Sequence, residues 1–169
     1  ITLSIRQKLM SGNSVYAFGN GGSSAIASYF VDELREIYKG SLKAYSRVHD
    51  ITSLKGLINS CIHHGSYKSD VFTKILDRFG INEGDVLLGV SSSGNSENVV
   101  HPFKNFPKSV RIGILGLQDG GRIGKSNMKD IAFIMPDSGG FRSYQRAEDG
   151  QRIALSSILH ALKRSENKI

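Results

Sequence analysis

Five short apolar segments are spaced along the chain, and most of them are rich in β-branched residues. They cover residues 14–18, 42–46, 86–90, 110–115 and 131–135. Runs of this length without regular polar alternation are typical of strands that are covered on both faces. Because segments with helical patterns separate them, the pattern predicts an α/β fold, a three-layer αβα sandwich with a parallel sheet between two layers of helices.

The segments between the strands predict four helices. In chain order they cover residues 23–40, 69–79, a short stretch from Asn95 to Pro102 or Pro107, and 144–164. Gly40 and Gly80 mark the ends of the first two, since glycine commonly stops a helix, and a proline is expected to end the third. Residues 116–129 contain four glycines and are predicted to form a loop.

Length and composition favour one domain over residues 1–169, long enough to bury a core without disulfides or metal ions. The chain begins with Ile1 rather than Met, so we expect a processed or truncated form of a longer chain. The one cysteine, Cys61, excludes an internal disulfide and a paired-cysteine metal site, as is usual in a reducing compartment. No apolar run approaches the ~20 residues that span a bilayer, so we expect a cytoplasmic protein without membrane contact.

The formal net charge of +7 suits an anionic partner, but Lys and Arg are spread along the chain and form no block. A solvated basic surface is the simplest interpretation, and an anionic metabolite is the main functional one. Because the sequence has no zinc-finger spacing, no aromatic RNA-binding signature and no basic zipper, we expect no direct contact with nucleic acid.

Two turns rich in Gly and Ser follow two of the predicted strands and open two of the predicted helices. They read GNGGSS at 19–24 and SSSGNS at 91–96. Ligands of open α/β sheets bind at the carboxyl ends of the strands, where helix N-termini direct unpaired N–H groups into a crevice. A phosphate suits such a place, because the helix dipole favours an anion and serine hydroxyls donate hydrogen bonds.

Either turn alone is a weak signal, since strand-to-helix loops also use Gly and Ser for turning and capping. The second turn has four serines in six residues, however, which is more than one cap requires. Neither turn fits the GxGxxG dinucleotide fingerprint or the GxxxxGK[ST] phosphate loop. The two turns therefore favour a phosphate site and disfavour a nucleotide cofactor.

The sequence resembles the sugar isomerase (SIS) domain family, and within it the sedoheptulose 7-phosphate isomerase group. The resemblance covers residues 12–162 and rests on FGNGGS at 18–23, GDVLLGVSSSGNSENV at 84–99 and GLQDGG at 116–121. It implies a five-stranded parallel sheet, a homotetramer with active sites between subunits, and interconversion of a ketose phosphate and an aldose phosphate. Relative to that group, the chain is expected to lack a leading helix.

The resemblance also implies roles for individual residues. The candidates for binding the phosphate or the sugar are Asn20, Gly21, Ser23, Ser91, Ser92, Ser93, Ser96, Asp119, Glu148 and Asp149. Moving a proton between adjacent carbons through an enediol needs a base near the carbon acid. Glu33 stands where the group has a catalytic Glu that also helps to bind zinc, so Glu33 is the leading candidate base.

Three chemical positions of the group are changed in this chain. Tyr29 replaces a zinc-binding His one turn before Glu33, and a serine at 156–157 stands near a second His that acts as acid/base and metal ligand. An Asn-Asp pair is replaced by a segment with His63 and His64, and His64 is a second catalytic candidate. Because zinc normally has at least three protein ligands of His, Cys or carboxylate type, we predict no family-type zinc site and no other cofactor.

The leading hypothesis is an aldose/ketose isomerase that acts on sedoheptulose 7-phosphate or a related seven-carbon sugar phosphate. The alternative is a non-catalytic SIS module that senses a sugar phosphate or binds a protein partner such as the replication initiator, and the changed residues motivate it. A third possibility is a metal-free isomerisation of another phosphosugar, because a fold does not fix a function. His160 is expected to lie on the helix surface or at the core edge.

Overall fold

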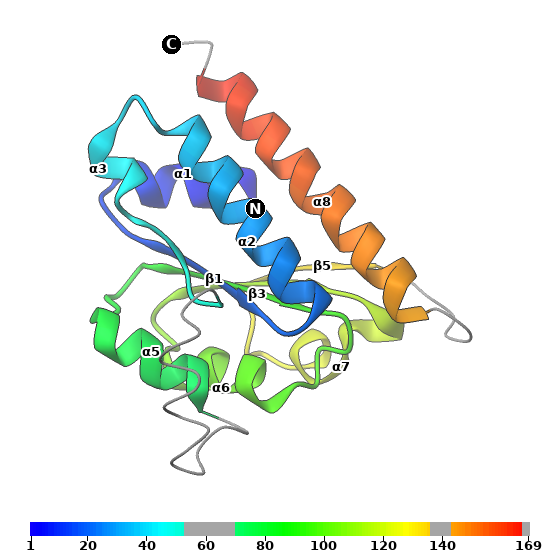
Figure 1. The fold of residues 1–169 in the computed structure, drawn as a ribbon. Coiled ribbons are helices and arrows are strands. Elements are labelled where there is room, and N and C mark those ends of the chain that lie inside the picture. Colours follow the sequence, from blue (N-terminus) through cyan, green and yellow to red (C-terminus); the bar gives the residue numbers. More distant parts are fainter. Residues whose placement is uncertain (53–69, 136–142, 167–169) are drawn as a thin grey trace.

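The computed structural model describes residues 1–52, 70–135 and 143–166, and at its centre lies a sheet of five parallel strands. The strands are β1 (Val15–Gly19), β2 (Val48–Asp50), β3 (Val86–Ser91), β4 (Val110–Leu115) and β5 (Ile131–Ile134). Their order across the sheet is β2-β1-β3-β4-β5, and helices cover both faces (Figure 1). The predicted three-layer α/β sandwich is confirmed.

The helices form two layers. One layer contains α1 (Thr2–Met10), α2 (Gly22–Ile37), α3 (Leu42–Tyr45) and α8 (Ser143–Glu166), and the other contains α5 (Val71–Phe79), α6 (Glu97–Asn105) and α7 (Leu117–Lys125) (Figure 1). The long helix α8 lies beside α2 on the same face of the sheet. None of the described helices is long and apolar enough to cross a membrane.

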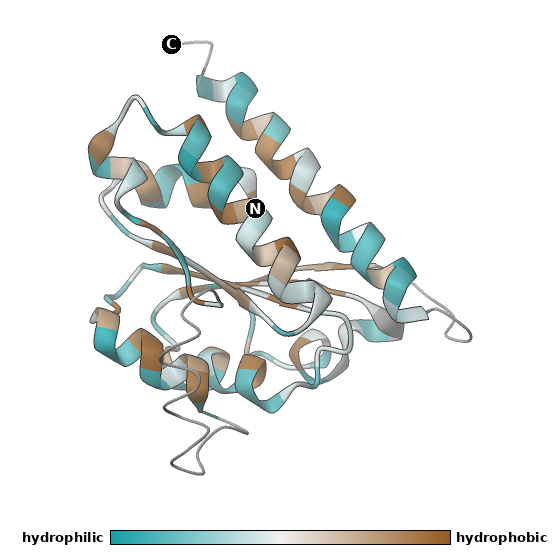
Figure 2. Ribbon diagram, viewed as in Figure 1, coloured by the Kyte–Doolittle hydropathy of each residue, from teal (hydrophilic) through white to brown (hydrophobic). Residues whose placement is uncertain are grey.

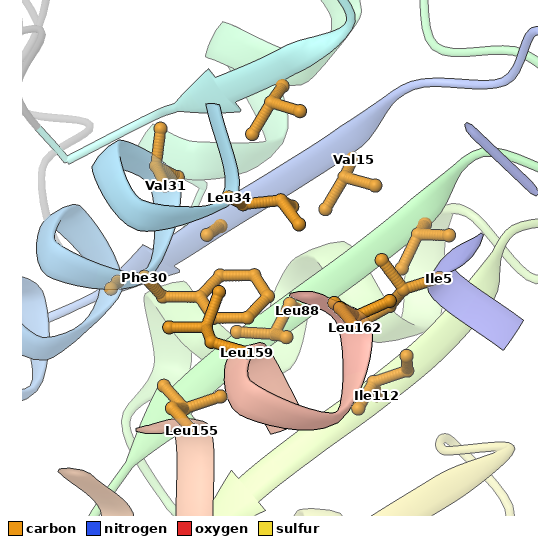
Figure 3. Packing of buried hydrophobic residues seen from close by; sticks show 14 of the residues in the cluster. Ile5, Val15, Phe30, Val31, Leu34, Leu88, Ile112, Leu155, Leu159 and Leu162 are labelled. Carbon is orange, nitrogen blue, oxygen red and sulfur yellow. The ribbon is translucent and has the colours of Figure 1, made fainter. Parts of the chain in front are cut away.

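Alternate side chains of the central strands enter two separate cores. On β1, Val15 and Ala17 join the core under α2 and α8, whereas Tyr16 and Phe18 join the core under α5 and α6. Because both faces are covered, both sets of alternate positions must be apolar, which explains the continuous apolar runs (Figure 2). Figure 3 shows the first core, where residues from α2 and α8, among them Phe30 and Leu159, meet over the sheet.

The prediction of a strand over residues 42–46 is wrong. Residues Leu42–Tyr45 form the short helix α3, and the strand β2 follows it at Val48–Asp50. Leu42 is 80% exposed, so its apolar side chain, which suggested a buried strand, does not contribute to the core. Val48 is buried and pairs with Val15 of β1, and it therefore sets the register of this edge strand.

Two expectations about glycine and proline are refined or corrected. Of the two proposed ends of the third helix, Pro107 agrees with the structure, because α6 ends at Asn105. Pro102 lies inside α6, where Pro102 and Phe103 are buried and packing offsets the missing N–H bond. Residues Leu117–Lys125, expected as a loop, form α7, although Gly120 and Gly121 within it have positive φ angles of 75° and 60°. The pattern also assigned no element to residues 1–12, where α1 lies.

Candidate functional site

The two turns rich in Gly and Ser lie side by side at the carboxyl edge of the sheet. They follow β1 and β3, which are neighbouring parallel strands with Gly19 paired to Val90. The first turn leads into α2 and the second into α6, so two helix N-termini open at this edge. The sequence pattern predicted this arrangement only as far as placing both turns at strand ends.

A small cavity of about 130 Å³ lies between the two turns and the start of α8. Its lining contains Asn20, Ser23, Val90, Ser91, Ser92, Ser93, Ser96, Tyr144 and Glu148. We call it the serine cavity. Seven of the ten substrate candidates from the sequence line it, and among the described residues no Lys or Arg does. An anion would therefore be held here by hydroxyls, backbone N–H groups and helix N-termini rather than by a cation.

The serine hydroxyls of the second turn differ in the hydrogen bonds that they already make. The Oγ of Ser91 accepts from the backbone N–H of Gly94 at 3.1 Å, and the Oγ of Ser93 accepts from that of Asn95 at 3.2 Å. Since a hydroxyl carries one hydrogen as well as its lone pairs, these two serines retain a hydrogen to donate. Ser91 and Ser93 are therefore well suited to donate to phosphate oxygens in the serine cavity.

Close backbone contacts fix the second turn in place. Gly94 has a φ of 62°, and a Cβ there would overlap the carbonyl oxygen of Gly120 in α7. Asn20 in the first turn and Asn98 on α6 exchange two amide hydrogen bonds of 2.8 Å, which ties the first turn to the helix that follows the second. Gly21, the N-cap of α2, has a φ of 51° that glycine adopts without strain.

Glu148 lies directly against the N-terminus of α2. A Cβ at Gly22 would overlap the carboxylate of Glu148, so the absence of a side chain at Gly22 lets this carboxylate approach the helix. Gly21, the N-cap residue of α2, has no side chain that could cap the helix by a hydrogen bond. A carboxylate near a helix N-terminus is favourable, because the helix dipole is positive there. The same carboxylate lines the serine cavity, where it would be close to a bound phosphate.

Glu33, the candidate base, lines a different cavity, which lies between α2 and α8 and measures about 430 Å³. We call it the α2/α8 cavity. Tyr29, Ser156 and His160 share its lining with Glu33. The structure thus brings Glu33 together with Tyr29 and with Ser156, one of the two serines near the second histidine position of the group, and adds His160 as an imidazole in the same lining. The guanidinium of Arg152 lies 5.8 Å from the ring centre of Tyr29.

The remaining candidates are dispersed. Asp149 lines an open hollow of about 760 Å³ along α8, and Asp119 lines one of about 440 Å³ beside α7. Asp119 pairs with Lys125 at 2.6 Å, and the hydrogen bond from Lys125 holds the pKa of Asp119 below its ordinary value. Both aspartates thus lie outside the serine cavity. His64 lies outside the described residues, and its role stays a prediction.

The donors around Glu33 do not form a zinc site of the kind that the resemblance implies. Tyr29 offers a phenol and Ser156 a hydroxyl in place of imidazoles. Among the described residues that line the α2/α8 cavity, the zinc-type ligands are Glu33, Glu36, His160 and Glu166. No group of three or more metal-binding side chains occurs within residues 1–52, 70–135 and 143–166. We therefore derive no chemical step through a metal.

Two residues of the site were not singled out from the sequence. Tyr144 lines the serine cavity, and Gln151 is a fully buried polar residue that contacts two of its serines. Both lie on α8, and Gln151 is one helical turn after Glu148. Only the way in which α8 docks on the sheet shows that they belong to the site.

Comparison with known proteins agrees with this architecture. The model of the SIS domain matches residues 2–105. The chain is similar to phosphoheptose isomerases from Cytophaga hutchinsonii, at 34% identity over 80% of this chain and 68% of that protein, and from Escherichia fergusonii, at 33% over 76% and 64%. The solved phosphoheptose isomerase from Francisella tularensis has the same fold, with a TM-score of 0.80, 21% identity, and coverage of 96% of this chain and 82% of that one.

The chain thus spans roughly two thirds of the length of the curated relatives that it matches. The domain match covers more than half of the chain, and the two turns rich in Gly and Ser on which the resemblance rests lie within it. The chain belongs to the SIS domain family.

Proposed function

We propose that this domain binds a phosphorylated sugar with its phosphate in the serine cavity, and that it isomerises the sugar between its ketose and aldose forms. The substrate class that fits best is sedoheptulose 7-phosphate, since the similar curated proteins are phosphoheptose isomerases. The observation that carries the proposal is the serine cavity itself, in which hydroxyl donors and two helix N-termini meet at adjacent strand ends.

Isomerisation through an enediol moves one proton between the first two carbons of the sugar, and hydroxyl protons move with it. A base must take the proton from one carbon and return it to the other. Glu33 is exposed on α2, and its cavity also contains a phenol, a hydroxyl and an imidazole that would serve hydroxyl proton transfers. These groups support Glu33 as the base of the proposed reaction.

We further propose that the protein is a cytoplasmic homotetramer with its sites between subunits. Large apolar and aromatic side chains near both cavities support an interface there: Tyr144 is 57% exposed and Ile153 is 66% exposed. Exposed side chains of this kind are enriched where proteins associate.

A second candidate function is binding of a sugar phosphate without turnover, as a sensor or as an adaptor for a partner protein. It is favoured because Glu33, the candidate base, does not line the serine cavity that is proposed to hold the phosphate. Glu33 lines the α2/α8 cavity, whereas the acid in the lining of the serine cavity is Glu148. A single chain that holds a phosphate in the serine cavity has only Glu148 as a described acid beside it.

The deciding experiment is an isomerase assay with sedoheptulose 7-phosphate, followed by NMR, with added zinc and again with a chelator. Glu33→Gln should remove turnover with little change in binding, whereas Ser93→Ala should weaken binding by about tenfold, the loss of one charge-assisted hydrogen bond. Saturable binding without turnover in the wild-type protein would favour the sensor or adaptor. Equal losses of binding in both variants would contradict the assigned roles.

A further inference from the structure

A single buried amide joins the three segments that meet at the serine cavity. The side chain of Gln151 on α8 is fully buried. Its Nε2 donates to the backbone carbonyl of Ile114 on β4 at 3.0 Å. Its Oε1 lies 3.5 Å from the Oγ of Ser23 in α2 and 3.5 Å from the Oγ of Ser92 in the second turn.

These contacts determine the direction of each hydrogen bond. A carbonyl oxygen only accepts, so the amide nitrogen of Gln151 has to face Ile114 and the amide oxygen has to face the two serines. An amide oxygen also only accepts, so Ser23 and Ser92 both donate their hydroxyl hydrogens to it. Both serines line the serine cavity, and the groups that they present to it are therefore lone pairs.

The opposite polarity holds for the neighbouring hydroxyls. Ser91 and Ser93 accept from backbone N–H groups, so their hydrogens are available to a ligand. The serine cavity thus has a donor side at Ser91 and Ser93 and an acceptor side at Ser23 and Ser92. A phosphate dianion needs donors, whereas the hydroxyl groups of a sugar can donate to acceptors.

We propose that Gln151 is a positioning residue that fixes this polarity and thereby lets the cavity prefer a sugar phosphate over free phosphate. The proposal rests on the proposed function, because it assumes that a sugar phosphate enters the serine cavity. Gln151 does not touch the ligand. It acts by keeping the hydroxyl hydrogens of Ser23 and Ser92 directed away from the phosphate and their lone pairs directed toward the sugar.

The test is the affinity of two probes, sedoheptulose 7-phosphate and inorganic phosphate, measured by isothermal titration for wild-type protein and for Gln151→Met. Methionine has a similar length and no amide, so it releases both hydroxyls while filling the space. We expect the affinity for the sugar phosphate to fall about tenfold and that for inorganic phosphate to change less than about threefold, on the scale of one or two hydrogen bonds. Gln145→Met, an exposed position on the same helix, is the matched control.

Ser92→Ala provides a second route if loss of the bond to Ile114 unfolds the methionine variant. It removes one acceptor and leaves Ile114 paired, and it should also weaken only the sugar phosphate. Equal loss of affinity for both probes, or no loss for either, would overturn the role of Gln151 while leaving the proposed function intact. A wild-type protein that binds neither probe would overturn both proposals.

Discussion

Four serines in one short turn have different chemical roles, although the sequence shows the same letter at each. Ser91 and Ser93 keep a hydrogen to donate because their oxygens already accept from the backbone. Ser92 has given its hydrogen to the amide of Gln151. Ser96 is the N-cap of α6 and makes no capping hydrogen bond through its side chain. At the scale of the residue, function depends on which hydrogen bonds the fold has already used.

A half-buried histidine gives a testable consequence of folding at the same scale. His49 on β2 stacks on Tyr16, with 4.8 Å between ring centres, and tilts against Phe79 at 5.2 Å. Burial, and then the charge of Arg35, lowers the pKa of His49 below its ordinary value of 6.5. At pH values between the lowered pKa of the folded state and the ordinary pKa, His49 therefore binds a proton in the unfolded chain but not in the folded chain.

The contribution of His49 to stability is complete above the ordinary pKa of 6.5 and is lost as the pH falls from there toward the lower pKa of the folded state. We predict that the free energy of unfolding, measured by urea denaturation, falls more steeply on acidification in the wild-type protein than in His49→Gln. His101→Gln on α6, outside this aromatic stack, should keep the wild-type slope. Identical slopes for the wild type and His49→Gln would contradict the prediction.

At the scale of the element, the N-terminus of α2 already has one anion beside it, and the proposed phosphate would be a second. The carboxylate of Glu148 lies against Gly22, and the serine cavity that would hold a phosphate opens at the same helix end. The two negative groups would repel each other across a short distance, while both would gain from the helix dipole. We therefore expect Glu148 to stabilise the empty domain and to oppose the binding of a phosphate.

Glu148→Gln should separate these two effects. Removing the charge should strengthen the binding of inorganic phosphate by about fivefold, and it should cost up to about 1 kcal/mol of stability, the usual worth of a carboxylate at a helix N-terminus. Titration calorimetry and thermal unfolding measure the two quantities. Asp149→Asn, the adjacent residue outside the cavity, is the control and should change neither. Weaker phosphate binding in Glu148→Gln would show that the carboxylate does not oppose the anion.

The success of sequence-based prediction also differs between elements. Strands β1, β3 and β4 were found because burial on both faces leaves continuous apolar runs in the sequence, and the edge strand β5 was found because its partly buried residues are all apolar. The edge strand β2 has three residues, and only Val48 is buried, so it leaves almost no pattern. The helix α7 was missed because glycines are typical of loops. Here Gly120 and Gly121 allow α7 to pack closely against Gly94 and Ser93, and a tertiary contact of this kind leaves no helical pattern in the sequence.

The candidate site shows the same division. The serines of the second turn could be placed at a strand end from local sequence, because a turn between β3 and α6 positions them all. Gln151, Tyr144 and the separation of Glu33 from the serine cavity depend on how α8 docks against α2 and the sheet. Contacts between elements that are more than a hundred residues apart leave no local pattern.

At the scale of the whole molecule, association of chains would change the surroundings of both cavities. Ile153 on α8 is 66% exposed and lines an apolar hollow of about 430 Å³ with Phe133, Met135 and Ile158. Solvent contact with a large apolar side chain costs about 1.5–3 kcal/mol relative to burial. An interface over this face of α8 would remove that cost, and the proposed tetramer offers such an interface.

We predict that light scattering after gel filtration gives the wild-type protein a mass several times that of one chain, and that Ile153→Asp reduces it. A buried, unpaired carboxylate opposes association strongly, whereas an exposed one leaves the fold of a single chain unaffected. Asp149→Asn, on the same helix, should keep the wild-type mass. If turnover of sedoheptulose 7-phosphate falls together with the mass in Ile153→Asp, the sites lie between subunits, because Ile153 lines neither the serine cavity nor the α2/α8 cavity. A wild-type protein with the mass of one chain would instead require a single chain to hold the phosphate and the base together.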